Sequence, residues 1–169
     1  MRRFDHPILQ RIQELGAPKP SDIVITHGSA LAVYGVRDEN PQSDIDLVTS
    51  QENIDYFLTV LHWRTQGRTT GHDAAGLPKI VARVLSPDNK FDVYLHDFVA
   101  KWFRERGKGR VYLPQLKELS EQDEATGIWV ATPDFVRLTK EGSTRQKDID
   151  DIAHIDAYLQ KRGSRVKKP

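Results

Sequence analysis

The chain has 169 residues, of which 38% are hydrophobic and 29% are charged, and its formal net charge is +1 at pH 7. This length suits one domain with one substantial core. The nearly balanced charge excludes a global attraction to nucleic acid, membranes or acidic ligands. Cysteine is absent, which excludes disulfides and thiolate metal sites. With neither a secretory signal nor an apolar stretch long enough to cross a bilayer, the sequence predicts a cytoplasmic protein without a membrane partner.

Helix and strand patterns alternate along the first hundred residues. Apolar residues recur at helical spacing in some segments, and short β-branched runs bounded by turn residues stand in others. The expected elements, in chain order, are a helix over 8–15, a strand over 22–26, a short helix over 29–34, a strand over 43–48, a helix over 54–61, a loop over 67–78, and two strands over 79–85 and 91–95 joined by a tight turn at 86–89.

The last third of the chain has helical patterns. Thr132-Pro133 is typical of a helix N-terminus, and a helix is expected to continue to Lys140. After a break at Gly142 and Ser143, apolar residues recur at helical spacing from Ile149 to Leu159. The sequence therefore predicts a single α/β (α+β) domain over 1–169. Its parts are a small mixed β-sheet core over about 22–97 flanked by helices, a helical C-terminal part over about 98–160, and a basic tail over 161–169.

Three aspartates are candidates for a metal site. Asp44 and Asp46 alternate with Ile45 and Leu47 on one expected strand, so the two carboxylates point to the same side. Carboxylates held this close repel one another unless a cation compensates them, and Mg²⁺ or Mn²⁺ takes such oxygen ligands together with substrate phosphates. Asp92, on a later strand, can supply a third ligand if that strand pairs beside the first.

Gly28 and Ser29 follow the first expected strand. Glycine at a strand end lets the backbone approach a phosphate closely, and the hydroxyl of Ser29 is a further donor at the start of a helix. The pair predicts a turn that can bind phosphate.

The order of these motifs resembles the signature of the polymerase-beta-like nucleotidyltransferase superfamily: Gly28-Ser29, a gap, Asp44-x-Asp46 between apolar residues, then a third carboxylate at Asp92. Lys140, followed by the run Lys147-Asp148-x-x-Asp151, resembles the minimal nucleotidyltransferases of the abortive-infection toxin type.

This resemblance implies a metal-dependent enzyme that transfers a nucleoside monophosphate from a nucleoside triphosphate, such as ATP, to an acceptor. Asp44, Asp46 and Asp92 would be catalytic metal ligands, Gly28, Ser29 and Lys140 would bind the triphosphate, and Lys147, Asp148 and Asp151 would support the site. A toxin of a toxin–antitoxin pair, with an antitoxin protein as partner, is also implied. Residues 63–78 match nothing in the pattern and no separate acceptor domain follows, so tRNA or other RNA, protein and small molecules all remain open as acceptors.

Other interpretations of the same residues remain open. The aspartates can be ordinary strand residues facing solvent, and Lys140 to Asp151 can belong to a solvated helix face with local ion pairs. The chain can then be a catalytically inactive nucleotide-binding module. A basic run with Lys or Arg at positions 101, 104, 106, 108 and 110 instead favours an RNA-binding module, and it suits an RNA acceptor if the chain is an enzyme.

Overall fold

The computed structural model describes residues 1–40, 42–65, 83–95, 97–98 and 111–163 of the chain. In these residues six α-helices accompany a seven-stranded mixed β-sheet and a separate pair of short strands. The α/β (α+β) fold class predicted from the sequence is confirmed.

The main sheet has its parallel pairs at the centre. Its strands are, from one edge to the other, β3 (Arg64–Thr65), β4 (Arg83–Leu85), β5 (Phe91–Leu95), β2 (Ile45–Thr49), β1 (Val24–Ile25), β9 (Trp129–Ala131) and β8 (Ser120–Gln122). Strands β2 and β5 run parallel, as do β1 and β9, and the other neighbouring pairs are antiparallel. Strands β6 (Asp97–Phe98) and β7 (Val111–Tyr112) form a separate antiparallel pair.

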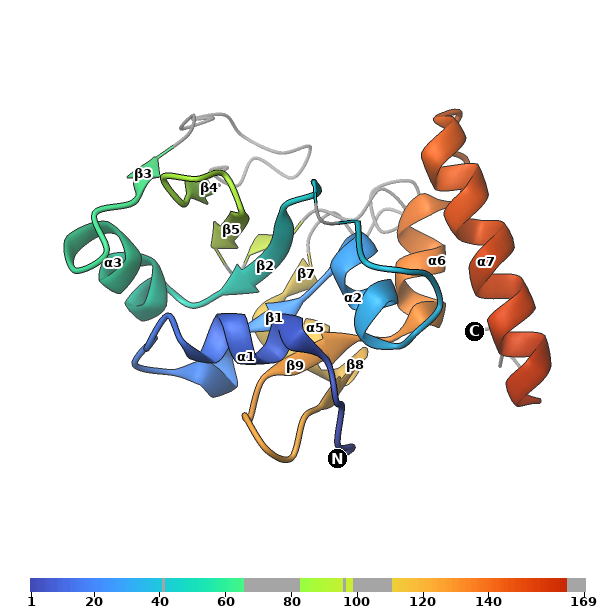
Figure 1. Ribbon diagram of the computed structural model, residues 1–169, viewed down its shortest axis with the longest axis horizontal. Coiled ribbons are helices and arrows are strands. Elements are labelled where there is room, and N and C mark those ends of the chain that lie inside the picture. The colour runs from blue at the N-terminus through green and yellow to red at the C-terminus, as the bar shows by residue number, and fades with distance from the viewer. Residues whose placement is uncertain (41, 66–82, 96, 99–110, 164–169) are drawn as a thin grey trace.

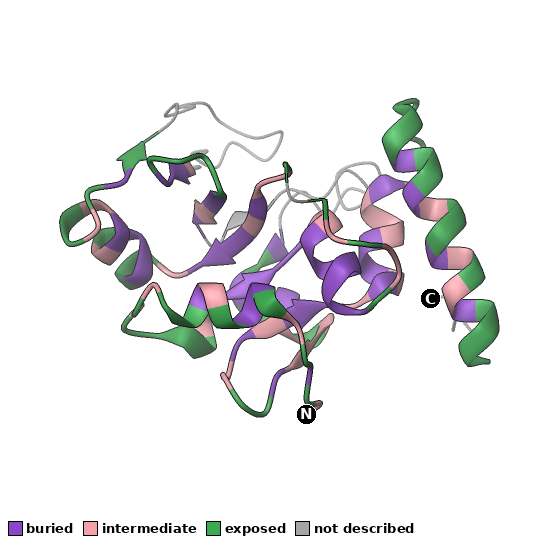
Figure 2. Cartoon of the chain, in the orientation of Figure 1, coloured by how far each residue is buried: buried purple, intermediate pink, exposed green. Residues whose placement is uncertain are grey.

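The helices surround this sheet. They are α1 (Pro7–Gln13), α2 (His27–Val33), α3 (Gln51–Thr59), α5 (Leu113–Glu118), α6 (Pro133–Lys140) and α7 (Gln146–Arg162). In Figure 1, α3 lies on the side of β3 and β4, whereas α2, α6 and α7 gather on the opposite side, with α7 outermost. Figure 2 shows that burial is concentrated in the central strands and in α2, while much of α7 is exposed.

The core forms where apolar strand residues meet apolar helix faces. Val24, Ile25, Leu47 and Val48 are fully buried in the two strands at the centre, and short β-branched segments of this kind suit a strand that is covered on both faces. Burying them is the main contribution to the stability of the sheet. Asp46 lies in β2 and Asp92 in the neighbouring strand β5, so this part of the sheet holds two of the three predicted aspartates.

Several predicted elements agree with the structure. Strand β5 has the predicted bounds, and Asn89 N donates to Ser86 O at 3.0 Å in the predicted turn. Helix α6 begins at Pro133 and ends at Lys140 as predicted, with the Thr132 hydroxyl accepting a hydrogen bond from Phe135 N. The bounds of several other elements differ from the predicted ones by one to three residues. Helix α2 begins at His27 rather than at residue 29, and α3 covers Gln51–Thr59 rather than 54–61. Strand β1 covers only Val24–Ile25, and residues 20–22 before it form a 3-10 helix.

The part of the chain predicted as helical, 98–160, also contains strands. Strand β9 adds to the main sheet beside β1, with Ile25 opposite Val130, and β8 follows at the sheet edge. These strands have only three residues each, so their alternation is too short to distinguish them from helical segments. The sheet therefore extends beyond the predicted core of 22–97.

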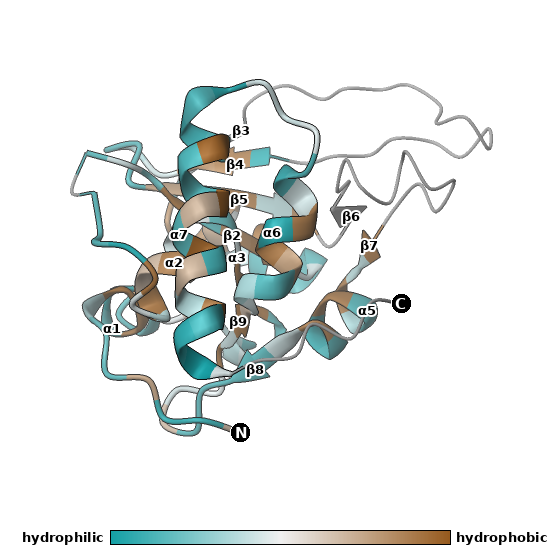
Figure 3. Cartoon of the chain, turned by 90° about the vertical axis from the view of Figure 1, so that its right-hand side faces the viewer, coloured by the Kyte–Doolittle hydropathy of each residue, from teal (hydrophilic) through white to brown (hydrophobic). Residues whose placement is uncertain are grey.

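Helix α7 buries the predicted apolar residues only in its later turns. Ile149 is 46% exposed, whereas Asp148 and Asp151 are buried together with Ile155 and Leu159. Figure 3, in which α7 faces the viewer, shows a largely hydrophilic helix. The first turns of α7 are therefore held by polar contacts, described below, and only its later turns by apolar packing.

No helix in the described ranges is long and apolar enough to cross a membrane. The predicted loop over 67–78, the basic run between 101 and 110, and the tail from residue 164 onward lie outside the described residues.

Candidate functional site

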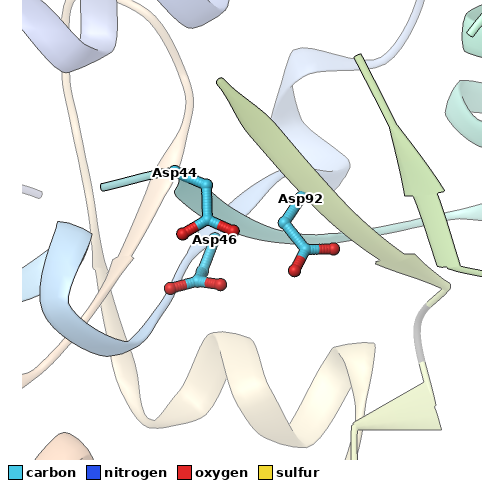
Figure 4. A group of neighbouring side chains, drawn as sticks. All are labelled: Asp44, Asp46 and Asp92. Atoms are coloured by element: carbon cyan, nitrogen blue, oxygen red, sulfur yellow. The ribbon is translucent and has the colours of Figure 1, made fainter. Parts of the chain in front are cut away.

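The three predicted aspartates meet at the parallel pair in the middle of the sheet. Asp46 lies in β2 directly opposite Asp92 in β5, and Asp44 precedes β2 by one residue, on the same side. One carboxylate oxygen of each residue lies within 4.8 Å of one from each of the others. Figure 4 shows the three side chains turned toward a common space beside the two strands. The pairing of β2 with β5 thus brings together aspartates that lie nearly fifty residues apart in the sequence.

The acidic triad, as we call Asp44, Asp46 and Asp92, carries an electrostatic cost. Burial and the neighbouring carboxylates of Asp44 and Asp92 raise the pKa of Asp46 to about 7. A set of three oxygen donors that repel one another fits a hard divalent cation such as Mg²⁺ or Mn²⁺. The residues present are therefore suited to hold the metal that the resemblance implies.

Gly28 and Ser29 lie in the first turn of helix α2, which we call the Gly28–Ser29 turn. Ser29 links this turn to β2 and to Asp44, the residue before it. Its hydroxyl accepts a hydrogen bond from Asp46 N at 3.2 Å and lies 3.4 Å from Asp44 O, to which it donates. Ser29 is 7% exposed. The turn that the sequence assigns to phosphate is thus also the support that sets the position of the Asp44–Asp46 backbone.

Gly28 is packed against an arginine that the sequence analysis did not single out. A Cβ at position 28 would lie 2.2 Å from Nη2 of Arg37, and Arg37 Nη1 donates to Asp151 at 2.7 Å. Glycine at this position therefore leaves room for the guanidinium.

Lys140, Asp148 and Asp151 form one buried ionic network. The Nζ atom of Lys140 lies 2.6 Å from Oδ1 of Asp148 and 2.9 Å from Oδ2 of Asp151, and Lys140 is only 7% exposed. Burial by itself would raise the pKa of Asp148, but hydrogen bonds from Lys140 and Ser143 outweigh it and hold the pKa below its ordinary value. Together with Arg37, this network joins the end of α6 and the start of α7 to the Gly28 turn.

Arg83 is the second arginine that sequence reasoning missed. It makes a bidentate ion pair with Asp92, with Nε at 2.8 Å from Oδ1 and Nη2 at 2.6 Å from Oδ2. The predicted hairpin could have identified this pair. A turn centred on 88–89 places Leu85 opposite Asp92, and Arg83 then lies diagonal to Asp92 on the same face of the sheet.

An open cleft of about 430 Å³ connects these groups, a volume within the range of small-molecule sites. Two of the triad, Asp44 and Asp46, line it together with Gly28, and so do the predicted residues Lys140, Lys147 and Asp148. Arg83 and Arg145 add further positive charge to its wall. The cleft thus places carboxylates and cations side by side, as a metal–triphosphate ligand requires.

His27 also lines this cleft and has a left-handed backbone conformation, with φ of 50°. Burial and the ammonium of Lys140 lower the pKa of His27 to about 4. Its Nδ1 lies 3.2 Å from the Thr26 hydroxyl and 3.9 Å from Asp46 Oδ2. The imidazole is therefore neutral at pH 7 and contributes no charge to the site.

No protein-family model matches this sequence. No curated protein is significantly similar to it either.

Proposed function

We propose that the protein is a metal-dependent nucleotidyltransferase of the polymerase-beta-like type. The observation that carries the proposal is the acidic triad, brought together on two parallel strands beside the Gly28–Ser29 turn. Asp44, Asp46 and Asp92 would hold Mg²⁺ or Mn²⁺. When bound, these ions neutralise phosphate charge and make an acceptor hydroxyl more acidic.

The chain's own residues would position the two substrates. The backbone at Gly28 faces the cleft, where a phosphate can approach it closely. Arg145 and Lys147 are exposed on the same wall, so their cationic groups can reach the outer phosphates. Lys140 also lines the cleft. Its contact with the triphosphate stays a prediction, since its ammonium forms ion pairs with Asp148 and Asp151.

The reaction would be an in-line displacement. The acceptor hydroxyl oxygen forms a bond to the α-phosphorus, the bond from that phosphorus to the bridging oxygen breaks, and pyrophosphate leaves. Asp44 and Asp46 would chiefly hold the metal ions and the triphosphate, and Asp92 would help to hold an ion near the acceptor hydroxyl and would accept or relay its proton. Most of the rate enhancement in such reactions comes from positioning and charge stabilisation.

Titration calorimetry with ATP and the other nucleoside triphosphates tests the binding half of this proposal. Binding is expected to tighten with Mg²⁺ or Mn²⁺ and to weaken in Asp44→Asn and Asp46→Asn, because both variants remove a ligand charge. Asp150→Asn, an exposed position on α7, is the matched control and should bind like the native protein. Equal nucleotide affinity with and without metal would contradict the site.

Transfer is tested by incubating the protein with each α-labelled nucleoside triphosphate, Mg²⁺ and a cell extract, then identifying the labelled product. Asp92→Asn should keep much of the triphosphate affinity but slow transfer by about a hundredfold or more. Labelled tRNA or other RNA, protein or a small molecule would identify the acceptor. Label transfer that is normal in Asp92→Asn would remove Asp92 from the site and leave Asp148 or Asp151 as the third carboxylate.

The alternative is a catalytically inactive module that binds nucleotide or RNA. It predicts metal-dependent triphosphate binding, or RNA binding, with no labelled product under any condition. Action as a toxin with an antitoxin partner, and location in the cytoplasm, remain predictions of the sequence resemblance and composition.

A further inference from the structure

Arg83 places a positive charge where the proposed site would bind a cation. Strand β4 pairs antiparallel with β5, which sets Arg83 opposite Tyr94 and diagonal to Asp92. The guanidinium donates one hydrogen bond to each carboxylate oxygen of Asp92, and the Tyr94 hydroxyl donates a further one to Oδ2 at 3.1 Å. Oδ2 therefore accepts two hydrogen bonds, and only Oδ1 has a lone pair left for a metal.

Burial explains why Asp92 has such a partner. Its side chain is 3% exposed, and a carboxylate that deep in the sheet requires a cation or several hydrogen bonds. Among the described residues, Arg83 is the only Lys or Arg that forms an ion pair with any member of the acidic triad. The hydrogen bond to Asp92 also raises the pKa of Arg83 further above its ordinary value, so the guanidinium keeps its charge at every physiological pH.

The Arg83 side chain can also leave this position. It is 37% exposed and lines the cleft that contains Gly28, Arg145 and Lys147. A triphosphate in that cleft would offer the guanidinium an acceptor of higher charge than one carboxylate, with the bidentate geometry that arginine favours.

We infer that Arg83 is a positioning residue that serves as the counter-ion of Asp92 in the metal-free protein and yields Asp92 to a divalent cation when a triphosphate binds. This inference rests on the proposed function, because it concerns the same triad and the same cleft. It means that the site binds the cation at Asp92 weakly without nucleotide, and that Arg83 couples the binding of metal and triphosphate.

The test measures Mn²⁺ binding at pH 8 by electron paramagnetic resonance, with and without a non-hydrolysable nucleoside triphosphate. Arg83→Gln removes the charge but keeps a hydrogen-bond donor for Asp92, and Arg83→Lys keeps the charge without the fork. Without nucleotide, Arg83→Gln should bind Mn²⁺ about tenfold more tightly than the native protein or more, because a cation no longer lies beside the ligand. Arg83→Lys should stay near the native affinity. Addition of the triphosphate should tighten Mn²⁺ binding less in Arg83→Gln than in the native protein.

Two results separate this inference from the proposed function. If Mn²⁺ binds and Asp44→Asn and Asp46→Asn weaken it, but Arg83→Gln binds no more tightly than the native protein, the role given to Arg83 is wrong and the metal site stands. If neither the native protein nor Arg83→Gln binds Mn²⁺ with or without triphosphate, the proposed function fails and the inference fails with it. Circular dichroism of each variant distinguishes loss of folding from loss of binding, and Asp92→Asn in the Arg83→Gln background should abolish the tighter Mn²⁺ binding.

Discussion

Asp46 connects the proposed site to the stability of the metal-free protein. Its pKa of about 7 in the folded state lies above the ordinary value of 3.8, because of burial and the carboxylates of Asp44 and Asp92. The folded protein therefore binds this proton more tightly than the unfolded chain does. The resulting stabilisation is complete below about pH 3.8 and is lost as the pH rises to about 7.

We expect Asp46→Asn to stabilise the metal-free protein at pH 8, since asparagine cannot repel its two neighbours. In EDTA, the melting temperature of this variant should exceed that of the native protein at pH 8, and the difference should shrink toward pH 5. Asp38→Asn, at an exposed position, is the control and should follow the native curve. If the melting temperatures of Asp46→Asn and the native protein change in parallel across this pH range, repulsion within the triad does not destabilise the native protein.

Gly28 is expected to tolerate no side chain while Arg37 is in place. Gly28→Ala brings a Cβ within 2.2 Å of Arg37 Nη2, and the guanidinium is held by Asp151. Moving it should destabilise the protein by about 1–3 kcal/mol, measured by urea unfolding. In the Arg37→Ala background, Gly28→Ala is expected to be much less destabilising. A double-mutant cycle would show this as non-additive changes in the free energy of unfolding. Additive effects of the two substitutions would mean that the contact is not the cause.

At the scale of elements, Lys140 of α6 is shared by two buried carboxylates of α7. Lys140→Ala leaves Asp148 and Asp151 buried without the ammonium that lies between them, although Arg37 and Ser143 retain their bonds to these carboxylates. Such a loss typically costs about 3–5 kcal/mol, and it is expected in urea unfolding without any ligand. Asp150→Ala, on the exposed side of α7, should change stability by about 0.5 kcal/mol or less.

Lys140→Ala is also predicted to weaken triphosphate binding, so its two roles have to be separated. Asp148→Asn in the Lys140→Ala background removes one of the uncompensated charges and should restore part of the stability. If nucleotide affinity stays low in that double variant, Lys140 contacts the triphosphate directly. A Lys140→Ala protein with native stability would instead show that the network does not hold α7 in place.

At the scale of the whole molecule, the late strands are expected to be necessary for the sheet that carries the site. Strand β9 pairs with β1, whose two residues are fully buried. A chain that ends at residue 112 lacks β8, β9 and the helices α5, α6 and α7, so it would expose the edge of β1 to water. We expect that chain to show no cooperative unfolding transition. A cooperative transition in the shorter chain would place the complete core within the first 112 residues.

The sequence by itself determined the parts of the molecule that depend on local periodicity and turn chemistry. The hairpin of β4 and β5, the capped start of α6 and the alternation that puts Asp44 and Asp46 on one side all follow from residues within about ten positions of one another. The α/β class followed from the same patterns.

Only the tertiary structure determined which strands pair and which side chains from distant segments meet. The parallel register of β2 with β5 places Asp92 beside Asp46, and neither strand carries a signal for that pairing, because parallel neighbours are joined through long connections. The same is true of β9 beside β1, and of Asp151, which reaches Arg37 across 114 positions of sequence. Hydrophobic spacing on α7 correctly predicted that Ile155 and Leu159 are buried. In the first turns of that helix, Asp148 and Asp151 face inward instead, where they form buried ion pairs with Lys140.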